Sequence, residues 1–140
     1  PGHTSEKKLE DRVLRRTNRV FVESICSKMP ELVKLIQGDS AAEVTTSGGR
    51  VRAVGSVVLE VLSLLTILKK SGGPEVPRAM LDHSLVPACC ARLFAHPWNS
   101  LLHFSVKSLL LAVIPAGSDD DLLVQVLEGD FLPRCCEAFV

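Results

Sequence analysis

Aromatic residues make up only 4% of this 140-residue sequence, although hydrophobic residues make up 46%. Its interior must therefore be aliphatic, built mainly from Leu and Val, which favours packed helices over a sheet rich in Tyr, Trp and Thr. The sequence also lacks an excess of either charge, because 16 basic residues balance 16 acidic ones. A neutral chain has no long-range field to attract polyanions, so nucleic acid and anionic membranes are poor default partners.

Long hydrophobic runs are missing as well. The most apolar stretch, Val57–Leu68, contains Glu60 and is followed by two lysines, and it is too short to span a bilayer. The sequence begins Pro-Gly-His, with no charged segment followed by an apolar run, so we expect no signal peptide. Residues 1–4 are compatible with a cloning remnant. These features predict a soluble protein of the cytoplasm, with the nucleus as the alternative compartment.

The cysteines do not form the pattern of a disulfide framework. Their number is odd and four of them lie in two adjacent pairs: Cys26, Cys89, Cys90, Cys135 and Cys136. We therefore expect reduced thiols in an intracellular protein. Zinc sites space their ligands so that both sulfurs reach one ion, whereas adjacent residues of a helix point about 100° apart. Small buried side chains explain the pairs best, and a metal-binding or redox domain remains the alternative.

Catalytic motifs are also absent. The sequence contains no Gly-rich phosphate loop, no H-E-x-x-H and no G-x-S-x-G. His83, His96 and His103 could pair with a cysteine in principle, but no local signature supports such a dyad. Consecutive aspartates at 119–121 follow Ser118, where they suit the positive end of a helix dipole better than a Ca²⁺ or Mg²⁺ loop. We expect no catalysis, no cofactor and no metal.

What the sequence does contain is helix after helix. Apolar residues at helical spacing, interrupted by Pro and Gly, predict helices over about 5–29, 30–37, 50–70, 75–83, 87–95, 97–114, 118–128 and from 133. The segment Asp39–Gly49 is small and polar and is predicted to be a loop. The strongest helix is Arg50–Lys70, whose apolar positions run almost all the way round and predict burial on several sides.

An internal repeat underlies these helices. Leu85–Cys90 is matched 46 positions later by Phe131–Cys136, the acidic and apolar segments before them align at the same offset, and Lys28–Val33 resembles an older copy. A period of 40–47 residues with two or three helices is typical of armadillo and HEAT repeats. We therefore predict an all-α fold, a right-handed α-solenoid segment. Residues 5–140 form one domain with units of about 5–49, 50–96 and 97–140, and we expect a fragment of a longer solenoid.

One segment resembles a known family. Leu93–Val106 is similar to the signature of the SAPS family, with matches at Phe94, Trp98, Asn99, Leu102, His103 and Val106. Gly49–Val54 resembles the family's Gly-Asn-x-Arg helix start, although the Asn is missing here. The similarity covers about residues 15–140 and is specific mainly around Trp98-Asn99. It implies a helical-repeat regulatory subunit that binds a serine/threonine phosphatase of the phosphatase 6 type and directs it to substrates.

Two groups of residues are candidates for partner binding. Arg12, Arg15, Arg16 and Arg19, with Lys8, form a basic stripe opposite an apolar stripe of Leu14, Phe21 and Ile25. This stripe could hold an acidic segment or a phosphopeptide, or it could be an ordinary solvated face.

The second group is Trp98, Asn99 and His103. These residues could contact a partner, or they could be structural: Trp98 would fill a groove between hairpins while Asn99 and His103 bond free backbone groups. The rival function is a HEAT or armadillo adaptor without a phosphatase.

Overall fold

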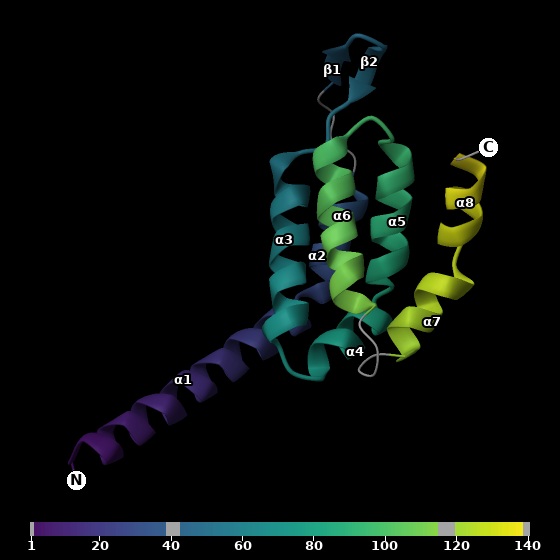
Figure 1. Ribbon diagram of the computed structural model, residues 1–140. Coiled ribbons are helices and arrows are strands. Elements are labelled where there is room, and N and C mark those ends of the chain that lie inside the picture. Colours follow the sequence, from purple (N-terminus) through teal and green to yellow (C-terminus); the bar gives the residue numbers. More distant parts are fainter. Residues whose placement is uncertain (1, 39–42, 115–119, 139–140) are drawn as a thin grey trace.

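The computed structural model describes residues 2–38, 43–114 and 120–138 (Figure 1). Within these ranges eight α-helices and one two-stranded hairpin follow one another: α1 Gly2–Ser27, α2 Met29–Gln37, β1 Glu43–Thr46, β2 Gly49–Arg52, α3 Ser56–Ser71, α4 Glu75–Asp82, α5 Leu85–Ala95, α6 Ser100–Val113, α7 Asp120–Glu128 and α8 Phe131–Ala138. The predicted all-α class is confirmed for the body of the molecule. The hairpin is an addition that the helix prediction did not contain.

The hairpin corrects two predictions. The predicted loop Asp39–Gly49 contains β1, and the helix predicted from Arg50 begins only at Ser56, because β2 occupies its expected first turn. The strands pair antiparallel from Glu43–Arg52 to Thr46–Gly49. Gly49 has a φ of 118°, which only glycine adopts without strain, and the flanking Val and Thr residues favour extended backbone. Residues 39–42 of the predicted loop lie outside the described part.

The helices follow a regular packing order. Each helix from α1 to α5 packs against the helix three places later in the chain, so that α1 meets α4, α2 meets α5, α3 meets α6, α4 meets α7 and α5 meets α8. The helices therefore form three rows, α1–α4–α7, α2–α5–α8 and α3–α6 (Figure 1). Consecutive helices from α1 to α6 also pack against each other, as do α7 and α8, which joins the rows into one body.

An aliphatic core lies between the rows. Its largest fully buried side chains come from α2, α3, α4, α5, α6 and α7: Met29, Ile36, Leu62, Leu65, Val76, Met80, Leu85, Val86, Leu102, Val106, Leu109 and Leu122. The predicted burial of α3 on several sides is only partly right, because Val57 and Ile67 are more than half exposed. One face of α3 is thus uncovered by the described chain.

The first helix is the exception to this packing. Only Val22, Ile25 and Cys26, near its C-terminal end, pack against the core, and α1 has no buried residue. The predicted apolar stripe therefore meets the core at Ile25 alone, while Leu14 and Phe21 remain 60% and 54% exposed. Figure 1 shows most of α1 projecting away from the other helices.

Several helix ends differ from the predicted ones for local reasons. α6 begins at Ser100 and not at Pro97, because Asn99 occupies the N-cap position. α5 and α8 each begin two residues before their proline, which then lies in the first turn, where its missing N–H is tolerated. The predicted cap Ser118 and the aspartate at 119 lie outside the described residues.

Candidate interaction surfaces

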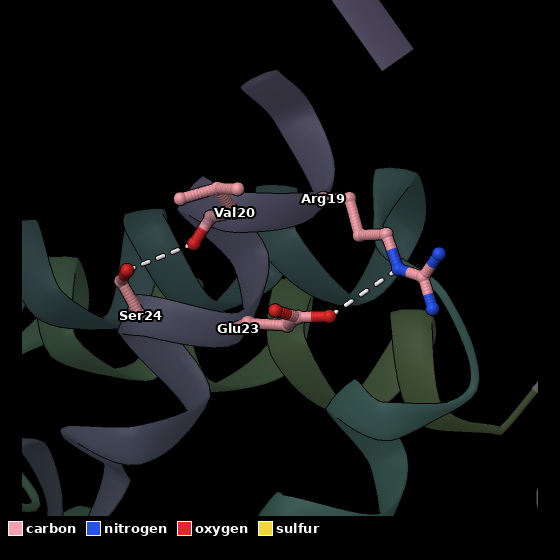
Figure 2. Close-up of polar contacts among 4 residues, drawn as sticks. All are labelled: Arg19, Val20, Glu23 and Ser24. Atoms are coloured by element: carbon pink, nitrogen blue, oxygen red, sulfur yellow. Dashed lines mark hydrogen bonds and ion pairs between the residues drawn. The ribbon is translucent and has the colours of Figure 1, made fainter. Parts of the chain in front are cut away.

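The basic stripe of α1 is fully on the surface. Lys8, Arg12, Arg15, Arg16 and Arg19 are all exposed, and their spacing of three and four residues places them along one face of the continuous helix. Arg19 forms an ion pair with Glu23, with 3.3 Å between Nε and Oε1 (Figure 2). Both side chains are mostly exposed, so water screens this pair and it contributes little stability. The five cationic side chains are therefore accessible from solvent.

An apolar face lies beside this stripe. A shallow groove runs along α1 and is lined by Val13, Arg16, Thr17, Val20, Phe21 and Ser24. The two hydroxyl groups in it donate to the helix backbone. Thr17 Oγ1 donates to the Val13 carbonyl at 2.9 Å. Ser24 Oγ donates to the Val20 carbonyl at 2.8 Å (Figure 2). Because these donors are already satisfied, the groove presents mainly apolar surface. α1 thus offers a cationic and an apolar face together.

The turn between α5 and α6 holds the second predicted group. The Asn99 side chain accepts a hydrogen bond from the Leu102 N–H at 3.0 Å, and His103 Nε2 lies 3.2 Å from the His96 carbonyl oxygen. His96 is itself buried, with its Nδ1 3.2 Å from the Arg92 carbonyl oxygen. These contacts tie the turn to both helices, as the structural alternative for Asn99 and His103 requires.

Trp98 behaves differently from its two neighbours. Its ring lies edge-on to the His96 imidazole, with 6.2 Å between centroids, and the residue is 42% exposed. It therefore does not fill a groove between hairpins. A large, rigid, half-exposed ring with an indole N–H is typical of residues that anchor protein partners.

The structure does not bring the two groups together. The turn that carries Trp98 lies next to the hairpin, at the end of the bundle opposite to the one from which α1 projects (Figure 1). A partner that used both the arginines and Trp98 would have to run along the length of the helices.

Two apolar features were missed from the sequence. Leu101, Phe104 and Leu111 are exposed along α6, and their spacing of three and seven residues was the available signal for a shared face. The other feature is a cavity of about 240 Å³ between α5 and the α7–α8 pair. The rings of Phe94 and Phe131 lie at its wall with 6.1 Å between their centroids. The Arg134 guanidinium carbon lies 5.4 Å from the Phe94 ring centroid. No sequence pattern pointed to it, because its walls come from α5 and from the α7–α8 pair, which α6 separates in the sequence.

The cysteines are unequal in their surroundings. Cys89 and Cys90 on α5 are buried, as predicted. The same prediction is wrong for Cys136 on α8, which is exposed, and only partly right for its neighbour Cys135, which is half-buried. Burial, with a smaller contribution from the neighbouring Cys135, raises the pKa of Cys90 to about 11, and burial raises the pKa of Cys89 as well. Neutral thiols are poor nucleophiles and poor metal ligands. Among the described residues no three His, Cys, Asp or Glu side chains gather as a metal site would require.

These differences predict a fixed order of thiol alkylation. With N-ethylmaleimide at pH 7.5, Cys136 should react first and Cys89 and Cys90 only after denaturant is added, as peptide mass spectrometry would show. Raising the pH to 9 should not make Cys90 reactive toward the maleimide, because its raised pKa of about 11 keeps the thiol of the folded protein protonated. Rapid modification of Cys89 or Cys90 in the native protein would favour the thiol-dependent alternative.

Comparison with known proteins adds no relative. No protein-family model, no curated protein and no solved structure matches this chain. Among the helices that the structure describes, none combines the length and apolar character needed to cross a membrane.

Proposed function

We propose that the chain is a non-catalytic helical-repeat scaffold that binds a serine/threonine phosphatase of the phosphatase 6 type and directs it to substrates. The observation that carries this proposal is the packing of each helix on the third helix after it. Repeats of three helices that stack in register have this neighbour pattern, since equivalent helices of successive units then touch. The units would be α1–α3, α4–α6 and α7–α8, wound as a right-handed superhelix.

The internal sequence repeat agrees with this division. Leu85–Cys90 and Phe131–Cys136, which are 46 positions apart, form the first turns of α5 and α8. The older copy, Lys28–Val33, spans the start of α2. These three helices are the members of one row. Sequence equivalence and spatial neighbourhood therefore coincide, which supports a repeat origin with unit boundaries different from those expected.

The phosphatase partner rests on the resemblance around Trp98. Of the matching residues, Leu102 and Val106 are buried, Phe94 packs partly against the core, and Asn99 and His103 hold the turn. These members can mark a fold without marking a site. Among these matching residues, Trp98 is the one that is exposed, at 42%.

In the proposed mechanism the helices act as a rigid frame for binding other proteins, and the chain itself catalyses no reaction. The exposed arginines of α1 and the Trp98 ring are the residue types that dominate the binding energy of protein interfaces. They lie at opposite ends of the bundle, so one surface could engage the catalytic chain while the other engages a substrate.

Affinity capture tests the partner and the surfaces together. The immobilised protein is expected to retain the phosphatase 6 catalytic subunit, and binding should fall at least tenfold for Trp98→Ala or for Arg12, Arg15, Arg16 and Arg19 changed together to Glu. The matched control changes the same four arginines to Lys, which keeps the charge. Absence of phosphatase from the wild-type eluate would reject the partner and leave a general helical-repeat adaptor. Equal capture by all variants would reject these surfaces.

A further inference from the structure

We propose that Thr17 on α1 is a phosphorylation site for a protein kinase that selects basic substrates. This inference goes beyond the phosphatase proposal and does not depend on it. It follows from three observations: the charges around Thr17, its exposure in a part of α1 that the core does not hold, and its position in the groove of α1.

The chain around Thr17 is basic on both sides. Residues 12–22 contain four arginines and no carboxylate, and the nearest acidic residues, Asp11 and Glu23, each lie six positions away. The arginines lie five, two and one positions before Thr17 and two positions after it. Every other Ser or Thr of the sequence has at most two Lys or Arg within five positions. Because kinases choose substrates partly by such charge patterns, a kinase with an acidic cleft would favour Thr17.

Thr17 also lies where a kinase can reach it. The residue is exposed, and of α1 only Val22, Ile25 and Cys26 pack against the described core. A helix that lacks tertiary packing is marginally stable in water, and a β-branched residue such as Thr17 lowers its stability slightly further. Unwinding one turn on each side of Thr17 therefore breaks no core contact of the described chain. It presents the acceptor in an extended form that fits an enzyme cleft.

The acceptor atom is the Thr17 side-chain oxygen. In the intact helix Thr17 Oγ1 donates a hydrogen bond to the Val13 carbonyl oxygen at 2.9 Å, and local unwinding breaks this bond. In the reaction the oxygen forms a bond to the γ-phosphorus of ATP, the bond from that phosphorus to the β–γ bridging oxygen breaks, and ADP leaves. The hydroxyl proton passes to the catalytic aspartate of the kinase.

Phosphorylation would change the groove of α1. Thr17 lies in this groove one turn after Val13 and one turn before Phe21, so the phosphate would stand between two apolar side chains. It adds a charge of about −1.5 to −2 at pH 7, which offsets roughly half of the charge of the four arginines in residues 12–22. An apolar partner segment that fits the unmodified groove would then have to desolvate the phosphate. The modification thus switches the groove from apolar to anionic.

Two other exposed hydroxyl groups fit less well. Ser24 lies in the same groove, but Glu23 directly precedes it and Ile25 directly after it packs against the core. Ser71 follows two lysines at the end of α3, but the turn before it contains the buried Leu68. Presenting either serine in an extended form would therefore disturb packed residues.

Phosphorylation of the purified chain by defined kinases tests the proposal. The probes are two kinases that select basic substrates, protein kinase C and cyclic-AMP-dependent protein kinase, each with radiolabelled ATP; a casein kinase, which selects acidic substrates, is the comparison. At least one of the two probes should transfer close to one phosphate per chain, at least tenfold faster than the casein kinase, and peptide mass spectrometry should place it on Thr17. No transfer by either probe, or phosphate found mainly on another residue, would overturn the proposal.

A matched pair of variants separates the hydroxyl group from the fold. Thr17→Val keeps the shape of the side chain and removes the acceptor, so incorporation should fall at least tenfold, whereas Thr17→Ser keeps the acceptor and should retain it. Ser71→Ala should leave incorporation unchanged, and circular dichroism verifies that each variant folds. Equal incorporation by the Val and Ser variants would contradict the assignment of Thr17.

A further variant tests the role of the charges. Changing Arg15 and Arg16 together to Gln, with Thr17 intact, should lower kcat/KM for phosphorylation at least tenfold. Both arginines are exposed, so the change leaves the core untouched. An unchanged kcat/KM would show that the basic surroundings do not direct a kinase to Thr17 and would overturn the proposal.

Discussion

Leu65→Ala is expected to lower the free energy of unfolding by about 2–5 kcal/mol, the range observed when a buried leucine is truncated. Leu65 is 0% exposed on α3, and α3 packs against α6 at the centre of the molecule. The substitution removes the transfer free energy of the two lost methyl groups and the methine, and it leaves a void that the neighbouring helices fill only partly. Urea denaturation followed by the helical circular dichroism signal measures the change.

Ile67→Ala is the matched control for this prediction. Ile67 lies two residues further along α3 and is 63% exposed, so truncation there leaves no cavity and should change stability by less than about 0.5 kcal/mol. Alanine also has the higher helix propensity, which offsets part of any loss. Equal losses at the two positions would show that α3 is covered on both sides in solution, contrary to the arrangement of the rows.

The sequence predicted those parts of the fold that arise from local spacing. The apolar periods of α3 and α6 and the prolines near the starts of α2, α5 and α8 predict where helices form. Four of these helices begin within three residues of the expected place, whereas α3 begins at Ser56 and not at Arg50. The match between Leu85–Cys90 and Phe131–Cys136 also predicted that α5 and α8 are equivalent, and the two helices pack against each other. These signals are visible because they depend on neighbours along the chain.

Features that depend on tertiary neighbours could not be read in this way. The stripe of Leu14, Phe21 and Ile25 has a helical period, but a period says only that a face is apolar and not what covers it. The hairpin before α3 depends on one glycine with a positive φ, at the position where the family resemblance had suggested a helix start. Val51 fits the strand and the helix pattern equally well, so periodicity alone could not decide.

The same distinction between local and tertiary features applies to the candidate sites. The arginine stripe was predictable, because its residues lie on one helix face and long cationic side chains stay in water. The contacts of Asn99 and His103 depend on where α6 begins, because a start at Ser100 places Asn99 at the N-cap and His103 within reach of the His96 carbonyl oxygen. The distance between Trp98 and the stripe depends on the packing of the bundle, which no local pattern encodes.

Gly72→Ala should destabilise the protein by about 1–3 kcal/mol, because a methyl group there has no room. A Cβ at Gly72 would lie 2.6 Å from the Leu68 carbonyl oxygen and 2.5 Å from a methyl carbon of the buried Val76. The same carbonyl oxygen accepts the Gly72 N–H at 2.7 Å, so the clash could be relieved only by disturbing the end of α3 or its contact with α4. Thermal unfolding should therefore show a midpoint several degrees lower.

The adjacent Gly73 provides the control, since Ala there would meet only the carboxylate of Glu75, a flexible side chain that can move away. Gly73→Ala should leave stability within about 0.5 kcal/mol or raise it, because alanine restricts the unfolded chain more than glycine does. The two substitutions remove the same backbone freedom, so their difference isolates the steric effect at the junction of α3 and α4. Equal stability of the two variants would mean that this junction is looser than the packing of Val76 implies.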